Sequence, residues 1–292
     1  MSAAALALVL AAALLHALWN LGAKKAQGNH HFVLASSLGV ALLWLPVAVY
    51  VGVNELPRWG WPQWAATLLS AALHLAYFNA LLAGYRASDM TVVYPVARGS
   101  GPLISSLVAL VLLDEHLGVY GALGLAGVVG GILLIAAGPA LLARGDAEQQ
   151  RRRKLGLLWG LLTGATIASY SVVDGYAVKM LAVSPLLYDY LCNLLRVPLA
   201  LPPVLRDRGG FWPALRRQWP YALLVAALSP LAYILVLYAM QLAPLSRVAP
   251  ARELSMLVAA LLGGQLLGEG ERGWRLAGAV LIAAGVVGLA AS

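Results

Sequence analysis

Charged side chains are scarce in this sequence of 292 residues, because Asp, Glu, Lys and Arg together make up only 11% of it. A soluble globule of this size needs more charge to cover its surface, so the composition excludes a water-soluble protein. Cysteine is nearly absent too. The lone Cys192 lies within an apolar run, which excludes an internal disulfide and a metal site built from cysteines.

Motifs of the common enzyme classes are also missing. The sequence contains no nucleophile elbow, phosphate-binding loop, dinucleotide fingerprint or metal-ligand cluster, and its polar stretches are too short to hold a nucleotide-binding domain. We therefore expect no enzyme, no cofactor, no metal ion and no ATP-driven pump. The net charge of +8 does not predict nucleic-acid binding, because the basic residues cluster in short stretches between apolar runs.

Apolar residues dominate the composition: they make up 61% of the sequence, whose mean hydropathy is +0.81. This leaves room for about ten membrane spans of ~20 residues each. We expect an all-α membrane protein with ten transmembrane helices, and a lipid bilayer as its surroundings. The apolar runs place these helices at 3–22, 32–53, 63–85, 91–113, 118–142, 155–178, 185–205, 218–241, 245–267 and 274–291.

The chain divides at its one charge run, GDAEQQRRRK, into a first half at 1–142, a cytoplasmic linker at 143–154 and a second half at 155–292. Lys and Arg fall almost entirely after the odd-numbered helices, which places these loops in the cytoplasm and both termini outside. The opposite loops hold Arg58 and Lys179. The cytoplasmic set is Lys24, Lys25, Arg86, Arg144, Arg151, Arg152, Arg153, Lys154, Arg206, Arg208, Arg216, Arg217, Arg272 and Arg275.

The two halves resemble each other when they are compared at a shift of 154 residues. Each half has five predicted spans, an odd number, so the second half must enter the membrane upside down. Such inverted repeats place their binding site near the middle of the bilayer, between the halves. The matching pairs are His16 with Tyr170, Asn20 with Asp174, Lys25 with Lys179, Arg98 with Arg252, Glu115 with Glu269, Gly124 with Gly278, and Gly131 with Gly285.

These features resemble the EamA branch of the drug/metabolite transporter superfamily. The resemblance rests on HALWNLGAKK, on the doubled five-span halves, and on a loop glutamate followed by a glycine-rich last span in LDEHLGVYGALGLAGVVGGILL and LGEGERGWRLAGAVLIAAGVVGL. It implies a transporter for amino acids, other metabolites, sugar phosphates or nucleotide sugars. HALWN and the later YSVVDG are also similar to a subset found near phosphonate-utilisation genes. We expect a multi-pass protein of a bacterial inner (plasma) membrane.

Arg98 is the most conspicuous candidate for a site residue, since it lies in YPVARGSGP inside an apolar run. A charge in mid-bilayer costs about 2.5–3.5 kcal/mol on insertion scales, so the side chain should face protein or water. Two prolines and two glycines predict a broken helix here. A guanidinium offers a planar fork to a carboxylate or phosphate. Arg98 therefore either binds substrate or forms a structural ion pair with Asp174 or Glu253.

Arg252 is the second candidate, in VAPARE. Glu253 follows it directly, and neighbours on a helix point about 100° apart, so we expect no direct pairing of the two. One of them would face the pocket and the other a neighbouring helix. Glu253 is also a candidate for binding a coupling ion.

His16 and Asn20 lie one helical turn apart, and so do Tyr170 and Asp174 in the second half. Both pairs should line one cavity. A buried Asp must be protonated or paired, so Asp174 either carries a coupling proton or cation or pairs with Arg98, Arg252 or Arg196. His16 either titrates or donates a hydrogen bond between helices.

Three aromatic positions complete the candidate substrate site: His74 and Tyr77 in the third predicted helix, and Tyr233 in the eighth. They either floor a substrate pocket or pack as ordinary core residues with satisfied hydroxyl groups. Glu115 and Glu269 precede helices and should favour the N-termini of the helices that follow them through the helix dipole.

Glycines recur in the fifth and tenth predicted helices, with GxxxG at 127–131. Such small-residue faces allow helices to approach closely. They favour either packing within the chain or a homodimer through these helices.

We therefore expect a secondary transporter that moves a small polar anionic metabolite by alternating access. Arg98 and Arg252 would hold the anion, and Asp174 or a histidine would carry the coupling ion. A flippase for lipid-linked headgroups is one alternative, which a groove open sideways to lipid would favour. A cationic multidrug exporter is another, and it predicts a pocket of net negative charge.

Overall fold

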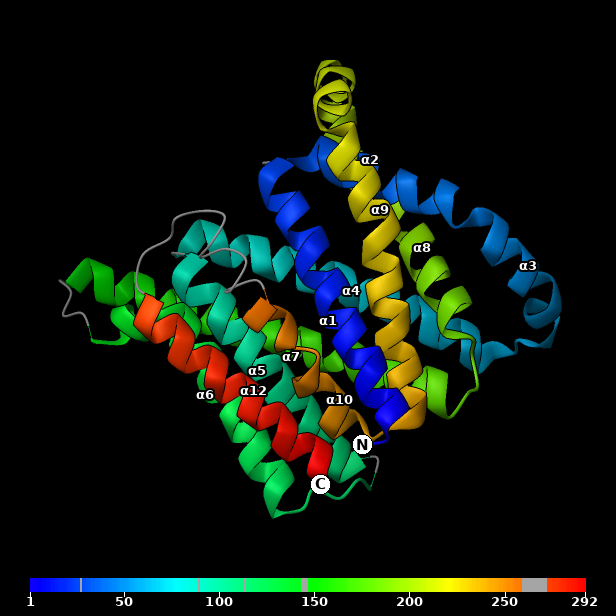
Figure 1. Ribbon diagram of the computed structural model, residues 1–292. Helices are drawn as coiled ribbons and strands as arrows, with labels where there is room; N and C mark the ends of the chain where they lie inside the picture. Colours follow the sequence, from blue (N-terminus) through cyan, green and yellow to red (C-terminus); the bar gives the residue numbers. More distant parts are fainter. Residues whose placement is uncertain (27, 89, 113, 143–146, 259–271) are drawn as a thin grey trace.

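The computed structural model describes residues 1–26, 28–88, 90–112, 114–142, 147–258 and 272–292. Within these ranges the chain is helical and contains no β-strand (Figure 1). The helices are α1 (Ala3–Ala26), α2 (His30–Leu43), α3 (Leu45–Glu55), η1 (Leu56–Arg58), α4 (Trp61–Ala87), α5 (Met90–Leu112), α6 (Val119–Leu142), α7 (Ala147–Lys179), α8 (Pro185–Arg206), η2 (Arg208–Gly210), α9 (Phe211–Leu242), α10 (Leu245–Ala251) and α12 (Arg272–Ala291).

Five segments of the described chain are long and apolar enough to cross a membrane: Ala3–Ala23, Trp61–Ala87, Val92–Leu112, Ala147–Lys179 and Arg208–Leu242. The pair α2 and α3 forms a sixth if it is counted as one bent span. Large apolar side chains point outward, such as Leu42, Tyr50 and Val111, which are 72%, 76% and 80% exposed. So much exposed apolar surface requires lipid around it, and the chain is an integral, multi-pass membrane protein.

The helix expected at 32–53 is wrong in one respect, because the chain bends by 56° between α2 and α3. Trp44 occupies the break, and Pro46 stands in the first turn of α3. A proline cannot donate an N–H to the carbonyl four residues before it, so the first helix cannot run on through this point. Trp44 is fixed there, since its indole Nε1 donates a hydrogen bond of 3.0 Å to the Ala226 carbonyl of α9.

The helix expected at 245–267 also differs, because α10 ends at Ala251. Pro250 lies inside α10, and residues 252 and 253 form a turn. Residues 259–267 of that expected helix lie outside the described residues, as does Glu269.

At the start of the second half, α7 begins at Ala147, within the stretch that we predicted as a linker at 143–154. The other eight expected helices agree with the structure to within a few residues, apart from the earlier starts of α7 and α9.

α6 and α12 lie side by side (Figure 1), and their glycines show that they run antiparallel. A Cβ added to Gly124 would lie 2.5 Å from the carbonyl oxygen of Gly285, and one added to Gly131 would lie 2.5 Å from that of Gly278. The partner number falls as the α6 number rises. Only glycine allows the two backbones this approach. The expected packing of these glycine faces within the chain is thus present in the described residues.

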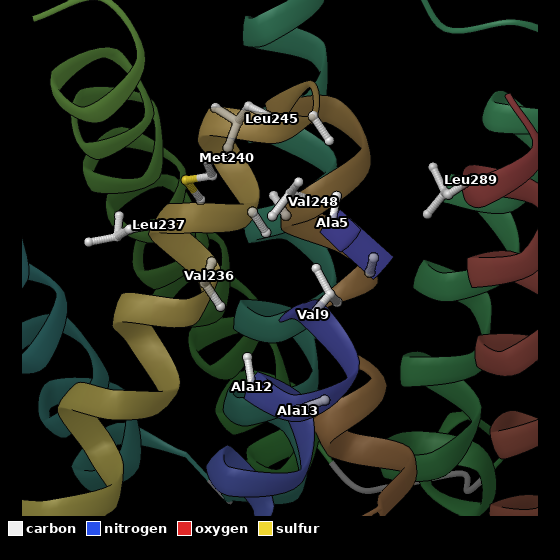
Figure 2. Packing of buried hydrophobic residues seen from close by; sticks show 14 of the residues in the cluster. Ala5, Val9, Ala12, Ala13, Val236, Leu237, Met240, Leu245, Val248 and Leu289 are labelled. Carbon is white, nitrogen blue, oxygen red and sulfur yellow. The ribbon is translucent and has the colours of Figure 1, made fainter. Parts of the chain in front are cut away.

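Residues of α1, α9, α10 and α5 share one buried apolar cluster. Val9 of α1, Val236 and Met240 of α9, and Leu245 and Val248 of α10 belong to one buried apolar cluster (Figure 2). α1 packs on α9, α4 packs on α7, and α5 packs on both α7 and α10. The arginine-bearing segments α5 and α10 are therefore neighbours at the interface of the two halves.

Candidate functional site

Arg98 lies on α5, which runs unbroken from Met90 to Leu112. The expected helix break at 94–102 is wrong. Pro95 falls in the second turn of α5, and Pro102 removes only the one hydrogen bond that its N–H would give to the carbonyl of Arg98. Packing against α6, α7 and α10 holds the helix on both sides of this gap. The guanidinium of Arg98 is directed into the protein, and the residue is 8% exposed.

Arg252 reaches the same region from the end of α10, whose last residue is Ala251. The start of α10 is fixed by Glu115, whose carboxylate accepts hydrogen bonds of 2.8 Å from Leu245 N and 2.9 Å from Ser246 N. We expected Glu115 to stabilise the helix that follows it. It binds a helix of the other half instead, because the loop before α6 folds over the N-terminus of α10. Its partner Lys179 Nζ lies 3.7 Å from Oε1.

Glu253 joins the two arginines. Its Oε2 lies 2.7 Å from Arg98 Nη2, and its Oε1 accepts a 3.4 Å contact from Arg252 Nε. Glu253 is fully buried, and both arginines are 8% exposed. The two residues that the sequence shift predicted to be equivalent, Arg98 and Arg252, thus share one carboxylate.

The pairing of Arg252 with Glu253 corrects our expectation that neighbouring residues could not meet. That expectation assumed a continuous helix, with side chains about 100° apart. The chain turns at residues 252 and 253 instead, so both side chains face the same way. Of the two partners considered for Arg98, the structure supplies Glu253 and not Asp174.

Several guanidinium N–H groups in this triad have no protein partner. Arg98 Nε and Arg252 Nη2 are buried and lack a hydrogen bond in the described part of the chain, and Glu253 Oε2 is held by its ion pair with Arg98 alone. Arg98 Nη2 also reaches Ser255 Oγ at a long 3.5 Å. Unpartnered buried donors cost free energy unless something else satisfies them, so these two nitrogens are suited to bind an acceptor that enters the site.

An aromatic cluster lies next to the arginines and brings together four predicted site residues. His74 of α4 stacks on Tyr170 of α7 with ring centroids 4.0 Å apart. Tyr77 and Tyr233 both meet Tyr170 edge-on, at 5.9 Å and 6.5 Å. These rings come from three helices of both halves, and Arg252 is close enough to Tyr170 and Tyr233 to interact with them electrostatically.

Asp174 sits one helical turn beyond Tyr170 and is fully buried. Its Oδ1 accepts a 2.8 Å hydrogen bond from Tyr188, and its Oδ2 accepts a hydrogen bond from Tyr233. No arginine of the described chain lies within ion-pair distance of this carboxyl group, so of the two alternatives for Asp174 the pairing with Arg98, Arg252 or Arg196 is not formed. Two tyrosine hydroxyl groups satisfy it instead.

His16 and Asn20 of α1 differ in their surroundings. His16 lies within electrostatic reach of both Arg98 and Arg252, and its ring packs edge-on against Trp19 at 4.9 Å. Asn20 turns back to its own helix, where Nδ2 donates a 2.7 Å hydrogen bond to the His16 carbonyl. His16 thus lies within electrostatic range of the arginines without a hydrogen bond to them among the described residues, whereas the amide of Asn20 bonds within α1.

Three further residues, which were not predicted from the sequence, contact the site. Tyr94 lies under Arg98, with its ring centroid 6.0 Å from Cζ. Ser255 contacts Arg98, and Tyr188 holds Asp174. A signal for Tyr94 was present, because it precedes Arg98 by one helical turn in YPVAR. Nothing in the sequence connects Tyr188 with Asp174, since they lie on different helices.

Comparison with known proteins gives a family and a fold. The family model described as EamA-like transporter family matches residues 3–137 and again residues 154–291. A solved structure described only as "Crystal structure of protein" shares the fold at a TM-score of 0.76 and 17% identity, over 99% of this chain and 96% of that one. No curated protein matches this chain.

Proposed function

Because the chain belongs to the EamA-like transporter family, within the drug/metabolite transporter superfamily, we propose that it is a secondary transporter for a small polar anion. It works by alternating access across a bacterial inner membrane. The substrate belongs to the amino acid, phosphonate or sugar-phosphate class. The observation that carries this proposal is the buried triad of Arg98, Glu253 and Arg252.

The charge of the triad supports an anion. Two guanidinium groups face one carboxylate, which leaves one positive charge in excess in a buried place. Burying an uncompensated charge is costly, and an entering carboxylate or phosphonate removes that cost. The free donors Arg98 Nε and Arg252 Nη2 offer the hydrogen bonds for it. A cationic drug would instead meet like charge, which argues against the multidrug exporter.

The aromatic cluster supports a small organic substrate rather than an inorganic ion. Tyr77, Tyr233 and His74 are only partly buried and lie beside the arginines. Such rings provide apolar contact for the carbon skeleton of a substrate while the arginines hold its charged end. His16 completes the set of site residues from α1.

Asp174 is our candidate for the coupling-ion site. Its carboxyl group is fully buried and is held by two tyrosine hydroxyl groups, so it can release or take up a proton without breaking an arginine ion pair. Glu253 is less suited to this role because a proton bound to its carboxylate would disrupt the ion pairs with Arg98 and Arg252. Tyr233 contacts both Asp174 and the aromatic cluster and so links the two sites.

Ten spans in two inverted halves are the architecture that fits this mechanism, with α2 and α3 as one bent span. The glycine pairing supports inversion. At the shift of 154 residues, Gly124 corresponds to Gly278 and Gly131 to Gly285, and the structure pairs them crosswise. Two equivalent helices can pair crosswise and antiparallel only when a two-fold axis perpendicular to them relates the halves. The contacts of α1 with α9 and of α7 with α4 exchange under the same operation.

The flippase alternative has one observation to consider, an apolar groove of about 370 Å³ between α3 and α8. It is lined by Ala48, Val49, Gly52, Val53, Leu56, Pro57, Leu187, Tyr190 and Leu191. None of these residues belongs to the arginine triad or to the aromatic cluster. In a flippase, the residues that bind the headgroup must lie in an opening toward the lipid. This groove contains none of the candidate binding residues, so it does not favour a lipid substrate over a solute.

Thermal-shift screening of the purified protein tests the proposal. A ligand at about 100 times its Kd stabilises the folded state by about 2.7 kcal/mol, so a cognate anion raises the melting temperature. We expect an amino acid, a phosphonate or a sugar phosphate to do so in the wild type and in Arg152→Lys, an exposed position. The shift should fall to about half or less in Arg98→Lys, because a ligand that binds tenfold more weakly stabilises by only about 1.4 kcal/mol at the same concentration. Stabilisation by organic cations alone would contradict the proposal.

A further inference from the structure

Three metal-ligating side chains meet at a place that neither the transport site nor the family match explains. His30 and His31 begin α2, and Asp207 stands between α8 and η2. One ligand atom of each lies within 4.8 Å of the other two. The sequence suggested no metal site, because 176 residues separate His31 from Asp207.

The distances fit a single small cation. His31 Nε2 lies 2.9 Å from Asp207 Oδ2, and His30 Nε2 lies 3.9 Å from the same oxygen. A tetrahedral ion with bonds of about 2.0–2.1 Å holds its ligand atoms roughly 3.3 Å apart. The two distances bracket this value, so rotations of the side chains suffice to close the site. The rings of His30 and His31 are 4.1 Å apart.

Part of the cluster lacks any other partner. His30 Nε2 is buried and has no hydrogen bond within the described residues, whereas His31 Nε2 bonds to Asp207 and would exchange that hydrogen bond for the metal ion. His31 is 2% exposed, so water does not reach its ring freely. A buried imidazole nitrogen without a donor is free to bind a metal ion through its lone pair.

The backbone around the cluster is fixed on both sides. Asn29 caps α2, and its Oδ1 accepts a 3.0 Å hydrogen bond from His31 N, which sets the direction of the histidine pair. On the other side the chain passes over the cluster at Gly210. A Cβ added there would lie 2.5 Å from His31 Nε2 and 2.7 Å from Asp207 Oδ2. Glycine is therefore required where the loop encloses these ligands.

We propose that His30, His31 and Asp207 bind one divalent transition-metal cation, with Zn²⁺ as the best match. Two imidazoles and one carboxylate are a common ligand set for this ion, and its fourth position is left to water. The site joins α2 of the first half to the connection between α8 and α9 of the second half. A bound ion would therefore cross-link the two halves on the side of the loops that we predict to be cytoplasmic, near Lys25 and Arg208.

Cobalt titration tests the site directly, because four-coordinate Co²⁺ absorbs visible light and Zn²⁺ then displaces it without colour. The protein is purified without a polyhistidine tag and stripped of metal with a chelator. We expect one Co²⁺ per wild-type chain, with the colour lost on addition of Zn²⁺. Binding should weaken by at least about tenfold in His30→Ala and in Asp207→Asn. His116→Ala, an exposed loop histidine, is the matched control and should bind like the wild type.

His30→Ala separates metal binding from folding, since it leaves the hydrogen bond between His31 and Asp207 in place. Its melting temperature in the absence of metal should equal that of the wild type. A wild-type protein that gives no coloured complex would overturn the proposal. So would equal Co²⁺ affinity in the wild type, His30→Ala and Asp207→Asn, and the three residues would then form only a hydrogen-bonded contact.

Discussion

Glu253 shows how single residues define the buried site. It is fully buried, and its two carboxylate oxygens lie against guanidinium groups from both halves of the chain. The excess positive charge remains because only one acidic residue serves two arginines. Transport then depends on which buried groups change their charge. In the proposed mechanism, Arg98 and Arg252 stay charged, and Asp174 gains and loses a proton.

Asp174→Asn tests the coupling role. Asparagine keeps the size of the side chain and an acceptor for Tyr188 or Tyr233, but it cannot bind or release a proton. We expect uptake driven by a proton gradient to be abolished, while exchange of substrate across proteoliposomes without a gradient persists. Glu148→Gln is the matched control on the same helix, because Glu148 is exposed. Gradient-driven uptake in Asp174→Asn at the wild-type level would remove the role that we assign to Asp174.

The sequence was informative about these residues only up to a point. Arg98 and Arg252 were predicted together because a charge inside an apolar run is costly and both halves carry one. The pairing of Arg252 with Glu253 was missed because it depends on a turn that the apolar run hides. The tyrosine partners of Asp174 were missed because they come from α8 and α9, and sequence spacing does not reveal contacts between helices.

At the scale of helices, the sequence predicted most positions correctly, but its prolines predicted one break that is absent. Apolar runs separated by polar stretches predicted most of the described helices. Pro102 suggested a break in α5, but neighbouring helices hold α5 together across the missing hydrogen bond. Pro46, near the start of α3, accompanies a real break at Trp44. The difference lies in tertiary packing, which the sequence of one helix does not contain.

Gly131→Ala tests the close approach of α6 to α12. The added methyl group would lie 2.5 Å from the carbonyl oxygen of Gly278, so the helices must separate, at a cost of about 1–3 kcal/mol. Gly130→Ala is the matched control one residue away, where nothing lies within 4 Å of the added group. Thermal unfolding in detergent should show a lower melting temperature for Gly131→Ala and no loss for Gly130→Ala. Equal melting temperatures would mean that the two helices do not pack closely.

At the scale of the whole molecule, the duplicated sequence and the packing point to the same symmetry. The loop Lys and Arg residues gather after alternate helices, and equivalent glycines of α6 and α12 pair crosswise. The sequence could predict this symmetry because corresponding residues of the two halves recur at a shift of 154 residues. It could not predict that His30, His31 and Asp207 meet, because that contact has no counterpart in spacing. The homodimer expected through the glycine-rich helices stays a prediction.

Cysteine labelling tests the inverted topology. The native Cys192 is buried, so Cys192→Ser gives a background without reactive thiols. Arg58→Cys and Arg208→Cys then place exposed thiols in equivalent loops of the two halves, after α3 and after α8. A membrane-impermeant maleimide added to intact cells should label Arg58→Cys only, and permeabilised cells should label both. Labelling of both positions from the outside would show that the halves are oriented alike.

The central claim, that Arg98 and Arg252 bind an anionic substrate between two halves, is tested most directly by transport in proteoliposomes. The substrate is the anion that stabilises the wild type most in the thermal-shift screen. Lysine keeps the charge that Glu253 needs but loses the planar fork of the guanidinium. We predict that Arg98→Lys and Arg252→Lys lose at least about tenfold in uptake, as expected when about 1.4 kcal/mol of binding is removed, while Arg152→Lys transports like the wild type. Wild-type uptake in both Arg98→Lys and Arg252→Lys would contradict the account.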